Sequence, residues 1–205
     1  ETGKPAMVVA IFSALSRDVP PSHFTIGIED DVSGSSLSYD PCFRLTEPSR
    51  VEAIFMGLGS DGTVGANKNS IKIIGESTSL YAQGYFVYDS KKSGSKTFSH
   101  VRFGPAPIRA PYLIEAADFI GCHQFSFIHQ MDVLERARPS AILLLESPYG
   151  PEEVWKHLPA RMQRELIEKK IRLFVIDARR VADALGMGRH TNTTVSYTHL
   201  TLPTI

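Results

Sequence analysis

The sequence predicts an α/β fold, a Rossmann-like layered domain with a mostly parallel sheet, preceded by a short helix, strand and linker segment. Two observations favour this class. From Val51 onward, strand patterns alternate with helical ones, and the unbroken apolar run at 141–145 is typical of a strand buried on both faces of a parallel sheet. A glycine-rich turn also follows the first of these strands and opens a helix, as in nucleotide-binding domains.

The elements are expected in the following order. Before residue 48, apolar periodicity indicates a helix over 5–16, alternation indicates a strand over 24–28, and a polar linker follows. Strands of the main domain are expected at 51–56, 84–88, 98–103, 119–122, 141–145 and 173–176. Its helices are expected at 63–74, 126–138, 152–158 and 159–170.

The chain divides into three stretches by this interpretation. Residues 1–48 are the end of a preceding domain plus a linker, and residues 49–194 form a truncated Rossmann-like domain. Residues 195–205 are expected to be non-native, because their reverse translation matches the transposase end and adapter of common sequencing libraries. The chain begins at Glu1 with neither an initiator methionine nor a signal-peptide layout, which indicates an origin inside a longer protein.

The amino-acid composition argues against several classes of function, namely nucleic-acid binding, membrane spanning and iron–sulfur cluster binding. The chain has 205 residues, of which 42% are hydrophobic and 21% charged, as in a globular protein. Its 22 basic and 22 acidic residues cancel, so no electrostatic footprint for nucleic acid or an anionic membrane is expected. No apolar run is long enough for a membrane span. Cys42 and Cys122 are expected to be free thiols, too few to ligate an iron–sulfur cluster and consistent with a cytoplasmic location.

The glycine-rich turn at 57–62 fits the G-x-G-x-x-G pattern. Glycines permit a tight turn and close approach of the backbone, and the N-terminus of the following helix favours a phosphate. The sequence therefore predicts a pyrophosphate-binding loop, with the alternative that the glycines serve only helix–strand packing. Asp61 is unusual, because a carboxylate repels a pyrophosphate unless it points away. The predicted binding residues here are Gly59, Ser60, Asp61 and Gly62.

The second strand of the domain ends at Asp89, where dinucleotide-binding domains of the NAD type place an acidic residue. The nearby Lys91 and Lys92 favour instead an extra phosphate on the ribose, as in NADP or coenzyme A, with a solvated loop as the alternative. Asn67 and Lys68 follow the glycine turn by about one helical turn and are weaker candidates to bind an anion or hold the turn.

Catalytic and metal-ligating residues are not predicted. The spacing of His100, His123 and His129 matches no helical pair of metal ligands, so structural roles are expected for all three. Cys122 and His123 are neighbours, so on a strand they point to opposite faces and cannot form a nucleophile–base pair.

Several long runs resemble the pyruvate:ferredoxin (flavodoxin) oxidoreductases, and the resemblance covers nearly all of residues 5–193. It implies an internal fragment comprising the end of the second domain and most of the third, gamma-type domain. The runs that carry the resemblance are 57–76, 81–94, 100–105, 122–124, 146–150 and 175–178.

The resemblance implies a multidomain enzyme, expected to be a homodimer, that depends on thiamine diphosphate with Mg²⁺. Pyruvate is decarboxylated, electrons pass through [4Fe–4S] clusters to ferredoxin or flavodoxin, and coenzyme A accepts the acetyl group. The third domain is associated with coenzyme A in this family, so the resemblance assigns coenzyme A to the predicted loop, lysine and helix residues. The other cofactors belong to domains that are absent here, and this fragment alone is expected to be inactive. Two alternatives remain, a purely structural interface domain and an independent NAD(P)-binding module.

Overall fold

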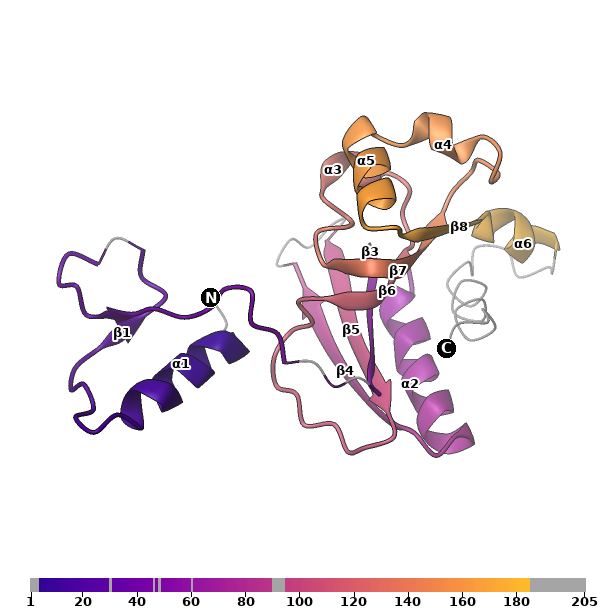
Figure 1. Cartoon of the computed structure of the whole chain (residues 1–205). Coiled ribbons are helices and arrows are strands. Elements are labelled where there is room, and N and C mark those ends of the chain that lie inside the picture. Colours follow the sequence, from indigo (N-terminus) through magenta and orange to yellow (C-terminus); the bar gives the residue numbers. More distant parts are fainter. Residues whose placement is uncertain are drawn as a thin grey trace. The chain divides into compact units, whose positions relative to one another are not determined.

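The computed structural model describes residues 4–29, 31–45, 47, 49–59, 61–89 and 95–184. The chain falls into two compact units, each described here by itself (Figure 1). The first runs to Glu47 and includes Ala110–Tyr112, and the second comprises Pro48–Arg109 and the chain from Leu113 onward. The domain limits expected from the sequence stay predictions, and the tail at 195–205 lies outside the described residues.

The first unit is small. Helix α1 spans Pro5–Leu15, which confirms the helix expected at 5–16, and proline at its first turn suits the fixed backbone angle of that residue. Strand β1 (Thr25–Ile26) pairs in parallel with β2 (Ser36–Leu37). The helix buries Met7 but leaves Phe12 66% exposed, so one of its apolar faces is open within this unit.

The second unit is built on a six-stranded sheet in the order β4-β5-β3-β6-β7-β8. Its strands are β3 (Val51–Leu58), β4 (Tyr81–Tyr88), β5 (Lys96–Gly104), β6 (Ala117–Cys122), β7 (Ala137–Glu146) and β8 (Arg172–Ile176). The block β3-β6-β7-β8 is parallel, whereas β5 is antiparallel to both β3 and β4. The α/β class and the mostly parallel sheet are confirmed, with an antiparallel edge added.

Helices cover both faces of this sheet (Figure 1). Helix α2 (Thr63–Ser77) lies along one face, where Ile71 packs against the cluster that contains Phe55 and Leu144. Helices α3 (Phe127–Gln130), α4 (Val154–His157) and α5 (Ala160–Glu168) contribute to the core on the other face. Helix α6 (Ala178–Ala184) follows β8.

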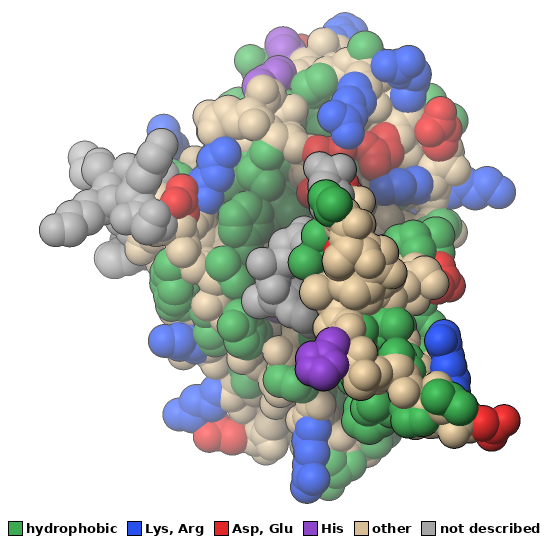
Figure 2. Space-filling model, turned by 90° about the vertical axis from the view of Figure 1, so that its left-hand side faces the viewer, with side chains coloured by type: hydrophobic (Ala, Val, Ile, Leu, Met, Phe, Trp, Pro, Cys, Tyr) green, Lys and Arg blue, Asp and Glu red, His purple; other side chains and the backbone are tan. Residues whose placement is uncertain are grey.

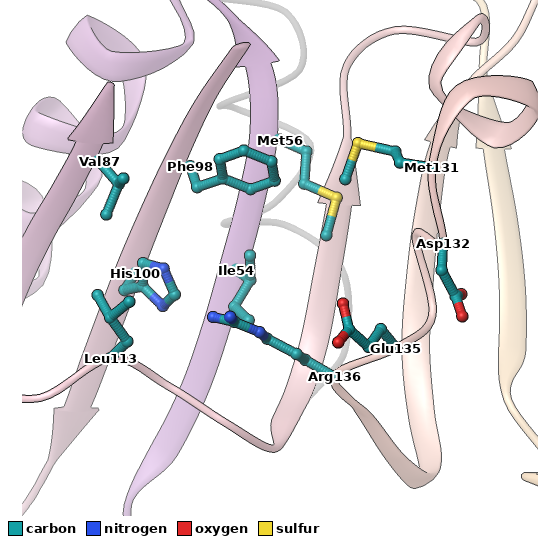
Figure 3. Close-up of a pocket in the computed structure, with 10 residues that line it drawn as sticks. All are labelled: Ile54, Met56, Val87, Phe98, His100, Leu113, Met131, Asp132, Glu135 and Arg136. Carbon is teal, nitrogen blue, oxygen red and sulfur yellow. The ribbon is translucent and has the colours of Figure 1, made fainter. Parts of the chain in front are cut away.

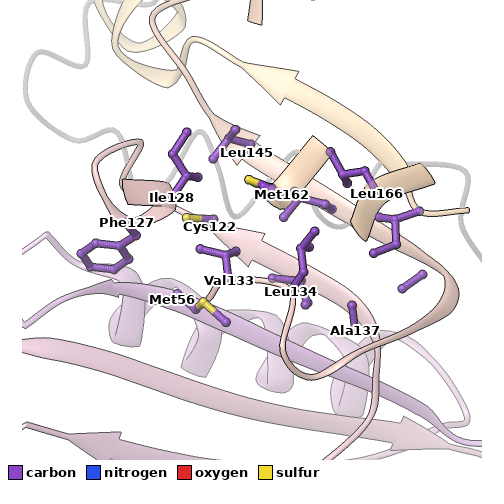
Figure 4. Packing of buried hydrophobic residues seen from close by; sticks show 14 of the residues in the cluster. Met56, Cys122, Phe127, Ile128, Val133, Leu134, Ala137, Leu145, Met162 and Leu166 are labelled. Carbon is purple, nitrogen blue, oxygen red and sulfur yellow. The ribbon is translucent and has the colours of Figure 1, made fainter. Parts of the chain in front are cut away.

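Strand β7 contributes to the core on both faces of the sheet, and Figure 4 shows its Leu145 among the buried residues of one cluster. Leu143 and Leu145 join the cluster that includes Met162 of α5, whereas Ile142 and Leu144 join the cluster on the α2 face. All four are at most 4% exposed. The run at 141–145 is therefore buried on both faces, as its unbroken apolar pattern predicts.

The helix expected at 126–138 is wrong over most of its length. Helix α3 ends at Gln130, and Met131 is extended with φ −155° and ψ 166°. Asp132 then accepts the backbone N–H of Leu134 at 3.1 Å, a local hydrogen bond that competes with helix formation. The apolar residues of this stretch are buried by turns, and β7 already begins at Ala137.

A network of charges links β3, β5, β6 and β7 at one end of the sheet. Glu52, which is 5% exposed, accepts Arg102 Nε at 2.8 Å through Oε1 and Arg138 Nη2 at 2.9 Å through Oε2. Asp118 accepts Arg138 Nη1 at 2.6 Å and the backbone N–H of Glu52 at 2.9 Å. Two carboxylates on the adjacent strands β3 and β6 thus bind the buried Arg102 and the partly exposed Arg138.

Elsewhere the charges are dispersed. On the face that Figure 2 shows, basic and acidic side chains are interspersed among apolar ones. This distribution agrees with the zero formal net charge of the sequence.

Candidate functional site

The candidate site is the turn between β3 and α2. Gly57 has Thr63 beside it, and a Cβ atom added at Gly57 would lie 2.7 Å from Thr63 Cβ and 2.8 Å from Asp61 Oδ2. A Cβ at Gly59 would lie 2.7 Å from Ser95 Oγ. Gly62 has φ +84°, a conformation that favours glycine. Steric contacts or a positive φ therefore explain why glycine stands at each of these three positions. The close contacts bring together the end of β3, Ser95 and the start of α2.

The Asp61 carboxylate is turned back onto its own loop. Its Oδ2 accepts the backbone N–H of Leu58 at 2.7 Å and Gln124 Nε2 at 3.3 Å, and its Oδ1 accepts the backbone N–H of Thr63 at 2.8 Å. These bonds fix the loop and the first turn of α2. They also use both carboxylate oxygens inside the chain, which is the arrangement an acidic residue needs beside a phosphate site.

His123 supports the loop from β6. A hydrogen bond of 2.9 Å joins its Nδ1 to Thr63 Oγ1, and its ring lies edge-on to Phe55 at 6.2 Å. Burial lowers the pKa of His123 to about 4, with the nearby Asp61 opposing the shift. The imidazole is neutral at pH 7, so the structure gives His123 the positioning role that was expected in place of a metal or acid–base role.

The turn between β4 and β5 lies against the glycine turn. The backbone N–H of Gly59 donates to Ser95 O at 2.9 Å, and the backbone N–H of Asp89 donates to Lys96 O at 3.0 Å. Strands β3 and β4 point the same way, because each is antiparallel to β5. The structure therefore brings the predicted loop together with the segment from which Lys91 and Lys92 come. Ser60, Lys91 and Lys92 themselves lie outside the described residues.

The sheet order differs from that of a NAD-type domain. There the second strand lies beside the first, so that its terminal acidic residue reaches the ribose. Here β5 lies between β3 and β4, which moves Asp89 one strand further from the glycine turn.

Pyruvate ferredoxin/flavodoxin oxidoreductase is the family that matches, over residues 52–196. The chain belongs to this family. It is 57% identical over 189 residues to the pyruvate-flavodoxin oxidoreductase of Rhodospirillum rubrum, an alignment that covers 92% of this chain and 16% of the relative. The chain thus spans about one sixth of the length of the curated relatives it matches.

Solved structures of such oxidoreductases share the fold. The pyruvate oxidoreductase subunit PORC of Thermotoga maritima has a TM-score of 0.56 at 15% identity, covering 76% of this chain and 77% of that one. A 2-oxoglutarate:ferredoxin oxidoreductase of Magnetococcus marinus, solved with 2-oxoglutarate, coenzyme A and succinyl-CoA, has a TM-score of 0.53 at 13% identity. That match covers 71% of this chain and 23% of the Magnetococcus chain.

Within this oxidoreductase domain, Asn67 is buried between α2 and the sheet with 0% exposure. Its Oδ1 and Nδ2 have no hydrogen-bond partner among the described residues, and the same holds for Thr97 Oγ1 and Ser99 Oγ on β5. Buried groups of this kind are commonly bridged by ordered water. Lys68 lies 5.5 Å from the centroid of the Phe86 ring. Contact of Asn67 or Lys68 with a ligand stays a prediction.

The sequence reasoning missed Thr63 and Gln124 as residues that fix the loop, and it expected a structural role for His123 without placing that residue at the loop. His123 and Gln124 lie in one of the runs that carry the family resemblance, which was the available signal. Across the residues described, no group of three or more potential metal ligands occurs. A search of the same residues finds no helix long and apolar enough to cross a membrane.

We expect the stability of the second unit of this oxidoreductase domain to fall as the pH drops from 7 to 5. Burial lowers the pKa values of His100 and His123 from 6.5 to about 4, so the unfolded state binds more protons between these values. The contribution of each neutral histidine to the free energy of unfolding is complete above pH 6.5 and is lost as the pH falls toward 4. Within this window, each histidine is expected to lower the free energy of unfolding by about 1.4 kcal/mol per pH unit, and urea unfolding measures this change.

The matched variant is His123→Gln, which removes one titrating group. Its free energy of unfolding should depend less steeply on pH than that of the unaltered chain. Identical slopes for both proteins would contradict the assignment.

Proposed function

We propose that this chain is part of a pyruvate:ferredoxin (flavodoxin) oxidoreductase and that its second unit helps bind coenzyme A. The parent reaction converts pyruvate, coenzyme A and an oxidised carrier into acetyl-CoA, CO₂ and a reduced carrier. Membership of the family and 57% identity to the Rhodospirillum rubrum enzyme support the parent reaction. The bound coenzyme A of the Magnetococcus marinus oxidoreductase agrees with the ligand.

The observation that carries the coenzyme A proposal is the junction of the two turns. Coenzyme A presents a pyrophosphate and a ribose phosphate close together. The glycine turn with the N-terminus of α2 suits the pyrophosphate. Ser95, whose carbonyl accepts the N–H of Gly59, follows Lys91 and Lys92 closely in the sequence, and we assign these two lysines to the second phosphate. The Asp61 carboxylate accepts the N–H groups of Leu58 and Thr63, so the pyrophosphate is proposed to bind the remaining N–H groups of the turn and of the first turn of α2.

The other cofactors of the parent do not fit the described residues. Burial raises the pKa of the Cys122 thiol to about 12, which disfavours the thiolate that an iron–sulfur cluster needs. Cys42 is exposed, and no third cysteine exists in the sequence. We therefore assign thiamine diphosphate, Mg²⁺ and the [4Fe–4S] clusters to the remainder of the parent enzyme, and no catalytic residue to this chain.

The proposed partners follow from the parent reaction. They are pyruvate, ferredoxin or flavodoxin, the other domains of the same polypeptide, and a second copy in a homodimer. A cytoplasmic location is proposed because both cysteines are free thiols.

Replacing Lys91 and Lys92 together by alanine is expected to weaken coenzyme A binding by about 1–3 kcal/mol, the range for charge-assisted hydrogen bonds. Isothermal titration calorimetry of the full chain measures this difference. The affinity for 3′-dephospho-coenzyme A should change little, because that ligand lacks the phosphate the lysines bind.

The control is the double variant Lys72→Ala and Lys156→Ala, which removes the same charge from exposed positions away from the turns. It should retain the original affinity. An equal loss in both double variants would mean that only the overall charge matters, and would refute the assigned site.

A further inference from the structure

A pocket lies on the face of the sheet opposite α2. It has a volume of about 190 Å³, and its floor is formed by Ile54, Met56, Val87 and Phe98 from strands β3, β4 and β5. Cross-strand pairing places these side chains on one face, because Phe98 pairs with both Met56 and Val87. Figure 3 shows them facing Met131 and Arg136 across the pocket. The floor is therefore apolar and rigidly set by the sheet.

His100 supplies a hydrogen-bond donor to this pocket. Its Nδ1 accepts the backbone N–H of Ile114 at 3.1 Å, and burial together with Arg136 and Arg102 lowers its pKa to about 4. The ring is therefore neutral, and the proton must reside on Nε2. Within the described part of the chain, the hydrogen bond found at the His100 ring is the one that Nδ1 accepts. Because His100 lines the pocket, an oxygen atom of an occupant can accept a hydrogen bond from Nε2–H.

Three charged side chains, Asp132, Glu135 and Arg136, also line the pocket. Arg136 donates to Ile114 O at 3.3 Å, which holds its guanidinium beside His100. Asp132 is bonded to Arg161 and to the backbone N–H of Leu134, and it points away from the pocket in Figure 3. Glu135 is exposed at the mouth. The pocket thus suits an apolar group that ends in an oxygen.

Size and surroundings favour a side chain over a small-molecule ligand. Pockets for drug-sized ligands measure about 300–1,000 Å³, which is well above the volume found here. Tyr81 and Tyr85 lie on the same face of β4 as Val87 and are 50% and 45% exposed, so this face of the strand presents aromatic side chains to the outside. Buried aromatic anchors that fill such pockets are typical of interfaces. Because the matched relatives are about six times longer than this chain, most of their polypeptide lies outside it.

We propose that this pocket receives a tyrosine side chain from a part of the parent polypeptide outside this chain. The ring lies on the floor of Met56, Val87 and Phe98, and the phenol oxygen accepts a hydrogen bond from Nε2–H of His100. The inference rests on the proposed parent enzyme but not on coenzyme A binding, because the pocket and the glycine turn are separate.

The test uses p-cresol, which has the ring and hydroxyl of a tyrosine side chain, and the full chain with ¹³C-methyl methionine. Saturable shifts are expected for the methyl signals of Met56 and Met131, while Met7 and Met162 serve as internal controls. Toluene, which lacks the oxygen, should bind about 2- to 10-fold more weakly, the ratio expected for one net hydrogen bond. Val87→Phe fills the pocket and should abolish the shifts.

Two results would overturn the proposal: no saturable shift of Met56 and Met131, or equal affinities for p-cresol and toluene.

Photocrosslinking tests whether the pocket is occupied in the assembled enzyme. In a chimera, residues 49–184 replace the aligned segment of the Rhodospirillum rubrum enzyme, with p-benzoylphenylalanine at position 85. Illumination should crosslink position 85 to a tyrosine-containing segment outside the transplanted region. Absence of that crosslink would refute the proposed occupant, whatever the affinity of the chimera for coenzyme A.

Discussion

Replacing Glu52 with alanine is expected to lower the free energy of unfolding of the second unit by about 3–5 kcal/mol. Glu52 is the acceptor for two arginines, Arg102 at 2.8 Å and Arg138 at 2.9 Å, and Arg102 is 1% exposed. Removing the carboxylate takes away the charge that Arg102 Nε contacts at 2.8 Å, and the desolvation cost of this buried guanidinium is then less well offset. Urea unfolding followed by circular dichroism measures the change.

The control is Glu76→Ala, which removes the same charge from an exposed pair. Glu76 lies 3.8 Å from Lys72 on the surface of α2, and both side chains are more than half exposed. Such pairs contribute about 0.2–1 kcal/mol. Similar losses for both variants would show that the buried network contributes no more than a surface ion pair.

Gly57→Ala is expected to displace the glycine turn and to weaken coenzyme A binding by about 5- to 150-fold. The new methyl group would lie 2.7 Å from Thr63 Cβ and 2.8 Å from Asp61 Oδ2, distances that neither atom tolerates. The first turn of α2 must therefore move, at a cost of about 1–3 kcal/mol for overpacking. Each 1.4 kcal/mol lost from a binding interaction corresponds to a factor of ten.

Calorimetric titration with coenzyme A and urea unfolding measure both consequences. The matched variant is Gly75→Ala in the same helix, where a Cβ meets nothing within 4 Å. It should leave binding unchanged and raise stability by about 0.5–1 kcal/mol. Unchanged binding by Gly57→Ala would disprove the role of the turn.

The parts of the fold that depend on local patterns could be predicted from the sequence. The buried strand at 141–145 is an unbroken apolar run, and α2 follows its glycine turn directly. The glycine turn itself was found because its pattern and context are both local.

The parts that depend on distant pairing could not be predicted in this way. The insertion of β5 between β3 and β4 is a non-local choice, and the sequence pattern of β5 is that of any strand. The helix expected at 126–138 fails because Asp132 bonds to Leu134, although the apolar spacing there is compatible with a helix. The hydrogen bond from Gln124 to Asp61 at 3.3 Å joins residues 63 positions apart and has no local signal in the sequence.

The central claim is that the two joined turns bind the pyrophosphate and ribose phosphate of coenzyme A. The most direct measurement is calorimetric titration of the full chain with coenzyme A, 3′-dephospho-coenzyme A and NADP. We expect coenzyme A to bind most tightly, with a loss of about 1–3 kcal/mol when the 3′-phosphate is absent. Binding of NADP as tight as that of coenzyme A, or no saturable heat with any of the three ligands, would contradict the account.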